Sequence, residues 1–288
     1  MKTFLLPLVA SLGLAVGGNA LANVSLQQTG SFGTSTYVNT NAAGSNASTS
    51  YGQSQGALYL QEGGSSVQFQ AYCIDPKTGT NLSANTYVKT DLNTFFTGNA
   101  AGTAGTYAAS GYNRQMTNGN YADQSAKNTA ANALLVRDNL VELFSYAYAD
   151  SLTSVTNATA FSLAVWEIMM QDGGSSGTGG FSLSTGELRS NGLTAASWDN
   201  GSDSVLGRAS QYLTALGAAS EGTAWSNLGL GVRSNYSYTV YYDNNSPFSQ
   251  NFIRVMSTGD SGQVPLPGTL ALAGLGLFGV AAARRRKA

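Results

Sequence analysis

A stretch of helical periodicity between two stretches of strand-like alternation limits the folds that this 288-residue chain can adopt. Before the helical part, residues 57–60 and 67–74 flank Gly63-Gly64-Ser65-Ser66, which is a hairpin signal. After it, Tyr and Val occupy every second position of 236–242, and residues 251–256 form a matching return strand. This order predicts an α+β domain, with antiparallel β-sheet regions at both ends and a central helical segment.

The central segment is expected to form three helices. Apolar residues recur at spacings of three and four within 128–150, which indicates an amphipathic helix there. A second helix is expected to begin at Thr156 or Asn157, both acceptable caps, and to end at Gly173-Gly174. A third is expected over 202–216. A helix pair resting on an antiparallel sheet would bury both apolar faces.

Three other segments carry weaker signals. Residues 23–51 are rich in Ser, Thr, Gly and Asn, so we expect an irregular or edge-strand segment that packs weakly. Residues 87–96 fit a strand or a short helix. Residues 98–119 are rich in Gly, Ala and Asn and are expected to form a long loop.

The chain contains one cysteine, Cys73, and no histidine. Cys73 shares a strand phase with Val67, Phe69 and Ala71, so its side chain is expected to face inward and to be inert, with a free reactive thiol or intermolecular pairing as the alternatives. One cysteine forms no intramolecular disulfide, so stability must come from the core and from hydrogen bonds. The absence of histidine excludes Ser-His-Asp and Cys-His catalysis and every histidine-based metal site.

Charge argues against nucleic acid as a partner. Five of the 14 basic residues lie in the two terminal segments, whereas all 15 acidic residues lie between them. The part in between therefore carries a net charge of about −6 and lacks a basic stripe that could contact phosphates.

Residues 1–22 have the pattern of a secretory signal peptide. Lys2 supplies the positive n-region, and residues 4–16 supply the apolar h-region. Ala20 and Ala22 provide the small residues of a signal-peptidase site, so the mature chain is expected to begin at Asn23. The apolar stretch is short for an uncleaved membrane anchor.

The C-terminal segment has three parts. It opens with Val264, Pro265, Leu266, Pro267 and Gly268, continues with the apolar run 270–283, and ends in four cations: Arg284, Arg285, Arg286 and Lys287. A helix over 269–283 would span roughly 22 Å, which is just short of a hydrocarbon core of about 30 Å. Terminal cations can snorkel, so a shallow or transient membrane span is expected, with the cations on the cytoplasmic side and the body outside.

This three-part segment resembles the PEP-CTERM sorting signal, which exosortases read in exopolysaccharide-producing Gram-negative bacteria. In this chain Leu266 stands where the motif usually has Glu, as in the Val-Pro-Leu-Pro form of such signals. The resemblance implies a precursor in the inner membrane and then residence at the cell surface or in the extracellular matrix. Signal peptidase and exosortase are the implied partners. A simple tail anchor without processing is the alternative.

Tyr72-Cys73-Ile74-Asp75 and the later segment 161–168, Phe-Ser-Leu-Ala-Val-Trp-Glu-Ile, resemble the two motifs of the thioester domain of bacterial surface adhesins. The likeness is clearest over 67–166. In that family a cysteine and a glutamine condense with loss of ammonia into an internal thioester. Cys73 matches the thiol, but Ser162 stands at the glutamine position. A hydroxyl has no carboxamide, so the resemblance implies the fold and a vestigial thioester position without the bond.

Three further sets of residues resemble catalytic or metal-binding patterns. Gly173–Gly177 matches Gly-x-Ser-x-Gly but has no histidine partner. Residues 199–203 alternate oxygen donors, yet a turn and helix cap explain them better than Ca²⁺ does. Four carboxylates are candidates for glycoside hydrolysis, although no spacing singles out a pair: Asp75, Glu142, Glu167 and Asp172.

We therefore expect three regions: a signal peptide (1–22), an extracellular α+β domain (23–263) and a sorting signal (264–288). The leading hypothesis is a non-enzymatic surface or matrix protein with an adhesin-like or structural role in biofilm and with no cofactor or metal. The alternatives are a carbohydrate-active enzyme that uses carboxylates alone, and a module that binds exopolysaccharide. A close carboxylate pair in a cleft would favour the enzyme, and an exposed aromatic groove would favour the sugar binder.

Overall fold

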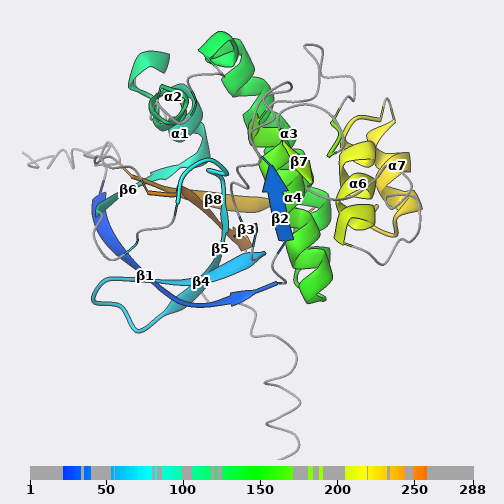
Figure 1. The fold of residues 1–288 in the computed structure, drawn as a ribbon, viewed down its shortest axis with the longest axis horizontal. Helices are drawn as coiled ribbons and strands as arrows, with labels where there is room; N and C mark the ends of the chain where they lie inside the picture. Colours follow the sequence, from blue (N-terminus) through cyan, green and yellow to red (C-terminus); the bar gives the residue numbers. More distant parts are fainter. Residues whose placement is uncertain are drawn as a thin grey trace, which may run out of the picture.

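A computed structural model describes residues 22–33, 36–39, 53–54, 56–79, 82, 86–98, 106–117, 121, 125–170, 181–183, 188–190, 205–218, 220–231, 234–243 and 249–257. Its centre is a closed, antiparallel β-barrel (Figure 1). Going round the barrel, the strands are β1 (Ala22–Phe32), β4 (Ala57–Glu62), β5 (Gln68–Cys73), β9 (Phe252–Ser257), β8 (Tyr236–Asp243) and β6 (Thr86–Asp91).

Alternation along the strands fills the barrel. Leu58 pairs with Ala71 and Leu60 pairs with Phe69, so these four side chains lie on the same face of the sheet. All four are buried, and the Phe69 ring stacks on Tyr241 at a centroid distance of 5.2 Å. The period-two pattern of the sequence therefore defines the interior of the barrel.

Helices cover one side of the barrel. They are α3 (Ala130–Ser151), α4 (Val155–Met170), α6 (Val205–Leu216) and α7 (Glu221–Asn227). In Figure 1, α3 and α4 lie beside the barrel, and α6 and α7 lie farther out. Every residue of α4 from Ala158 onward is buried, because the helix packs against α3, α6 and β5.

Shorter elements complete the described fold. These are α1 (Leu92–Thr97), η1 (Tyr107–Ala109) and α2 (Gly111–Met116), with a three-stranded sheet of β3 (Gln53–Ser54), β2 (Thr36–Asn39) and β7 (Arg189–Ser190). The Asp91 side chain accepts a hydrogen bond from the Thr94 N–H and so caps α1. Gly98 ends α1 with a φ of 73°, a backbone conformation that side chains disfavour.

The first and the last barrel strands leave the barrel at the same end. In the ladder between β8 and β9, Ser257 pairs with Tyr236, where β8 begins. β1 starts beside β6, with Ala22 opposite Lys89, and runs toward the other end. The hairpin between β4 and β5 lies at the same end as Ser257. We call this the tethered end, and we call the end where β5 and β8 finish the distal end.

Several sequence expectations are confirmed. The structure mixes helices and strands, as the α+β prediction required, and the β4–β5 and β8–β9 pairs form as expected. Helices α3, α4 and α6 correspond to the three predicted helices. Residues 87–96 were expected to form a strand or a short helix, and they form a strand followed directly by a short helix.

Other expectations are wrong. The sheet regions at the two ends of the domain are one closed barrel, because strands distant in sequence pair with each other. The weakly packed segment 23–51 contains β1, which is an inner barrel strand paired on both sides. The loop 98–119 contains η1 and α2. Helix α4 is capped by Ser154, whose hydroxyl accepts the Asn157 N–H, and not by Thr156 or Asn157. Val67, which was expected to share the inward face of its strand, is exposed.

The two sorting segments lie mostly outside the described residues. Among the residues that the structure describes, no helix is long and apolar enough to cross a membrane. The expected signal peptide before Ala22 and the expected helix over 269–283 are not among them.

Candidate functional site

The candidate site lies at the distal end of the barrel, around Cys73. Cys73 is the last residue of β5 and is buried, as its strand phase predicted. The Asp75 N–H donates to Cys73 Sγ at 3.3 Å. Burial, and then the negative charge of Asp75, raise the pKa of the Cys73 thiol well above its ordinary value. The group therefore stays a protonated thiol, which is a poor nucleophile.

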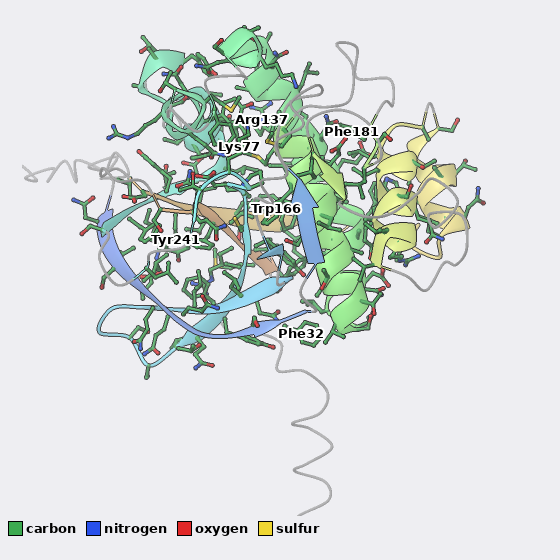
Figure 2. All side chains as sticks on the ribbon, viewed as in Figure 1. Phe32, Lys77, Arg137, Trp166, Phe181 and Tyr241 are labelled. Carbon is green, nitrogen blue, oxygen red and sulfur yellow. The ribbon has the colours of Figure 1, made fainter. Side chains whose placement is uncertain are left out.

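Helix α4 packs against this strand end. The Trp166 indole N–H donates to the Cys73 carbonyl oxygen at 3.0 Å, and the Phe161 ring lies 4.7 Å from that of Tyr72. Figure 2 shows Trp166 between the barrel and the helices. Ser162 is buried and lies one helical turn before Trp166, so it shares that side of α4. The two segments that carry the thioester resemblance are thus in contact through Trp166 and Phe161.

Asp75 is the buried carboxylate of the site. Burial raises its pKa to about 6, although hydrogen bonds to its charged form oppose that shift. One of these bonds comes from the Tyr121 hydroxyl, at 2.6 Å from Oδ1. The Lys77 ammonium lies 5.5 Å from the centroid of the Tyr121 ring. Asp75 therefore titrates close to neutral pH inside a closed environment.

A chain of hydrogen bonds leads from Tyr121 to the other strands. The Gln115 amide donates to the Tyr121 hydroxyl at 3.2 Å and to the Ile74 carbonyl at 2.9 Å. The Asn251 amide then donates to Gln115 Oε1 at 2.9 Å, and its own oxygen accepts the Asp243 N–H at 2.8 Å. Helix α2 is thereby joined to the ends of three barrel strands.

This series of hydrogen bonds ends at strand β6. Asp243 Oδ2 accepts the Ser249 N–H at 2.7 Å, and the Tyr87 hydroxyl donates to Ser249 Oγ at 2.8 Å. Burial raises the pKa of Tyr87, and the negative charges of Asp243 and Asp75 add to the shift. We call the linked residues the distal network: Asp75, Tyr87, Gln115, Tyr121, Asp243, Ser249 and Asn251.

The three described carboxylates among those predicted for glycoside hydrolysis each have a different partner. The Glu142 carboxylate accepts the Trp225 indole N–H, and the Glu167 carboxylate accepts the Ser182 N–H, both at 2.9 Å. Asp75 belongs to the distal network, and Asp172 lies outside the described residues. Glycoside hydrolysis needs two carboxylates on either side of an open sugar site. Among the described carboxylates, none of the predicted four shares such a site with another.

Sequence reasoning missed most of the distal network. Asp243 and Ser249 flank a turn signal, and Gln115 and Tyr121 lie in or just after the segment expected to be a loop. Only the tertiary fold makes these residues neighbours. The one available signal was the Cys73–Asp75 motif, which locates the centre of the network without its partners.

A second charged cluster lies inside the barrel, toward the tethered end. Glu62 Oε1 accepts hydrogen bonds from Lys89 Nζ at 2.7 Å and from the Tyr241 hydroxyl at 2.6 Å. Burial would raise the pKa of Glu62, but these two bonds and the charge of Lys89 outweigh it, so the pKa is lowered. The Arg254 guanidinium lies 4.6 Å from the Phe69 ring centroid. Figure 2 shows Tyr241 among the barrel strands.

The remaining predicted sites lie outside the described residues or at their margin. Ala20 is not described, whereas Ala22 and Asn23 are the first two residues of β1, where the mature chain is expected to begin. The residues of the sorting motif and the cationic cluster are not described, nor are residues 173–177 and 199–203. Among the described residues, no group of His, Cys, Asp and Glu could hold a metal ion.

Comparison with known proteins identifies the C-terminal segment. Residues 263–287 match the PEP-CTERM protein-sorting motif. No curated protein and no solved structure matches the chain. The chain therefore carries an exosortase-sorting signal, which makes it an exported surface protein that exosortase processes.

Proposed function

We propose that this chain is a structural or adhesive protein of the cell surface or exopolysaccharide matrix, that it forms no internal thioester, and that its body is not an enzyme. The observation that carries the proposal is the position of the chain ends. β1 begins and β9 finishes at the same end of the barrel. A domain attached through the segment after β9 would thus stand with its distal end away from the membrane.

The closed distal end supports the non-catalytic part of the proposal. Asp75, Asp243 and Cys73 are each at most 5% exposed, and the distal network uses their polar groups to join strands and α2. Buried polar groups that are satisfied in this way stabilise one arrangement of a core. A catalytic carboxylate or thiol needs access to a substrate, so the burial of these groups supports a structural role for them.

The described surface gives less support to sugar binding. Sugar-binding sites commonly stack an exposed aromatic ring on the sugar. Among the described residues, the exposed large apolar side chains are Val67, Leu134, Leu135 and Val155, and none of them is aromatic. Among the described tyrosines, many instead pack into the core, as the Tyr72, Tyr148 and Tyr212 contacts with Phe161 illustrate.

The test is made on protein recovered from the cell exterior. Its intact mass should show cleavage after Ala22 and within the sorting segment, with no deficit of one ammonia. Replacement of Arg284, Arg285, Arg286 and Lys287 by serine should retain the protein in the cell and abolish its contribution to surface attachment, whereas four lysines should preserve both. Hydrolysis of the exopolysaccharide by the purified protein, or a blocked thiol with an ammonia deficit, would contradict the proposal.

A further inference from the structure

The first two turns of α3 carry an apolar stripe that the described part of the domain covers only in part. Ala130, Ala131, Leu134 and Leu135 are all exposed, and the two leucines are 39% and 44% exposed. The spacing places these residues on one side of the helix. Ala133, Val136 and Leu140 on the opposite side are buried in the core. The described part of the domain therefore covers this side of the helix only in part.

This arrangement is unusual for the outward side of a helix. A surface helix normally presents charged or polar residues to solvent. Four large apolar residues are exposed in the described part of the chain, and two of them are adjacent on this stripe. Burial of the exposed part of the two leucine side chains would be favourable. Figure 1 shows one end of α3 projecting beyond the barrel, and Figure 2 places Arg137 at that end.

The charges beside the stripe favour a second copy of the same chain as the partner. Arg137 is fixed by hydrogen bonds to Asn93 Oδ1 at 2.8 Å and to Asp138 Oδ1 at 2.9 Å. The Asp138 side chain is nevertheless 63% exposed. The first turn of α3 contains no acidic residue, so its helix dipole has no negative side chain of its own there.

A two-fold symmetric contact would bury the exposed leucines and would also bring a carboxylate to the N-terminus of each α3 helix. If two α3 helices pack antiparallel with the axis between Leu134 and Leu135, Asp138 of one copy lies over Ala131 of the other. The carboxylate then meets the positive end of the second helix dipole, and the four leucines bury one another. A symmetric contact needs one patch that is complementary to itself, and this stripe has that property.

We propose that the α3 stripe is a homotypic contact through which neighbouring copies of this protein associate at the cell surface. The inference rests on the proposed structural role and names the partner as a second copy. Two helical turns form a contact well below the standard interface size, so the association is weak in dilute solution. Attachment to one surface raises the effective concentration of the copies and makes such a contact useful.

The experiment is sedimentation analysis of the processed protein over a range of concentrations. We expect a weak, concentration-dependent monomer–dimer equilibrium with a Kd on the order of 0.1 mM. Substitution of both Leu134→Glu and Leu135→Glu should raise the Kd by at least about tenfold, since four carboxylates would face one another. Val155→Glu is the control, because Val155 is 41% exposed on a different helix and should leave the Kd unchanged.

A second variant tests the symmetry. Leu135→Cys in a Cys73→Ala background places a thiol beside the proposed axis, so mild oxidation should yield a disulfide-linked dimer. The same substitution at Val155 should remain monomeric. A wild-type protein that stays monomeric at millimolar concentration, or a dimer that the double leucine variant retains, would overturn the inference. Surface attachment that persists in a strictly monomeric protein would overturn it while leaving the proposed function intact.

Discussion

The indole N–H of Trp166 donates a hydrogen bond to the backbone carbonyl of Cys73 at 3.0 Å, across 93 residues of sequence. Both residues are buried, so this bond joins the middle of the helical layer to the end of a barrel strand. It also orders the strand end where Asp75 turns back on Cys73. The two motifs of the thioester resemblance are therefore held together by a structural contact that needs no covalent bond.

Replacement of Trp166 by phenylalanine should leave the Cys73 carbonyl without this donor. A buried acceptor left unsatisfied costs about 1–3 kcal/mol, and the smaller ring adds a packing loss, so the free energy of unfolding should fall by at least that amount. Urea denaturation measures the change. Trp225→Phe is the matched control, because its Glu142 partner is only half-buried and can bind water instead. Equal losses in the two variants would contradict the role given to Trp166.

Asp75 should make the protein more stable in mild acid. Its pKa is about 6 in the folded protein and about 3.8 when exposed, so the folded state binds the proton more tightly. Stability from this group is fully present below about pH 4 and is lost as the pH rises through 6, by about 3 kcal/mol in total. Urea denaturation between pH 4 and pH 8 should show this loss in the wild-type protein.

The control for Asp75 is Asp75→Asn, which keeps the shape but does not titrate. The difference in unfolding free energy between wild type and variant should change across this pH range, which removes the contribution of Glu62 and other carboxylates from the comparison. A difference that stays constant from pH 4 to pH 8 would show that Asp75 does not titrate there.

The sequence predicted the elements better than it predicted how they close. Alternation and turn signals locate β4, β5, β8 and β9, since these strands form hairpins with near neighbours. Closure of the barrel depends on β1, and the polar composition of β1 does not show the apolar alternation that predicts a barrel strand. Only Val24, Leu26 and Phe32 give β1 apolar contacts with the core, while its backbone pairs with β4 and β6. Backbone pairing of this kind leaves little trace in side-chain composition.

The site shows the same limit. Strand phase predicted that Cys73 faces inward, and the motif pointed to Asp75 and Trp166. The partners of Asp75 were not predictable, because Tyr121 and Gln115 follow a segment rich in Gly and Ala that carries no periodic signal. Asn251 contributes through a contact with Gln115, 136 residues away. Such a contact is fixed by the closure of the barrel and has no local signature.

The Cys73 thiol should be unreactive in the folded protein. Burial and the neighbouring Asp75 raise its pKa, so almost no thiolate forms at pH 8. The disulfide reagent DTNB should not react with the native protein within minutes, so no thionitrobenzoate is released, and it should titrate one thiol per chain in denaturant. Rapid native labelling would contradict the closed distal end, and a thiol absent even after unfolding would indicate a covalent bond to Cys73.

Asn251 should contribute strongly to the free energy of unfolding, because its side chain makes two buried hydrogen bonds. Its amide donates to Gln115 and its oxygen accepts the Asp243 N–H, so Asn251→Ala leaves two buried groups without a partner. Each such group costs about 1–3 kcal/mol, which predicts a combined loss of roughly 2–6 kcal/mol. Asn93→Ala is the control: Asn93 accepts from Arg137 at an exposed position, where water can replace it, so a loss below about 1 kcal/mol is expected. Guanidinium denaturation of the two variants and the parent at pH 7 measures both values, and a loss for Asn251→Ala no larger than that for Asn93→Ala would show that the distal network does not hold the strand ends together.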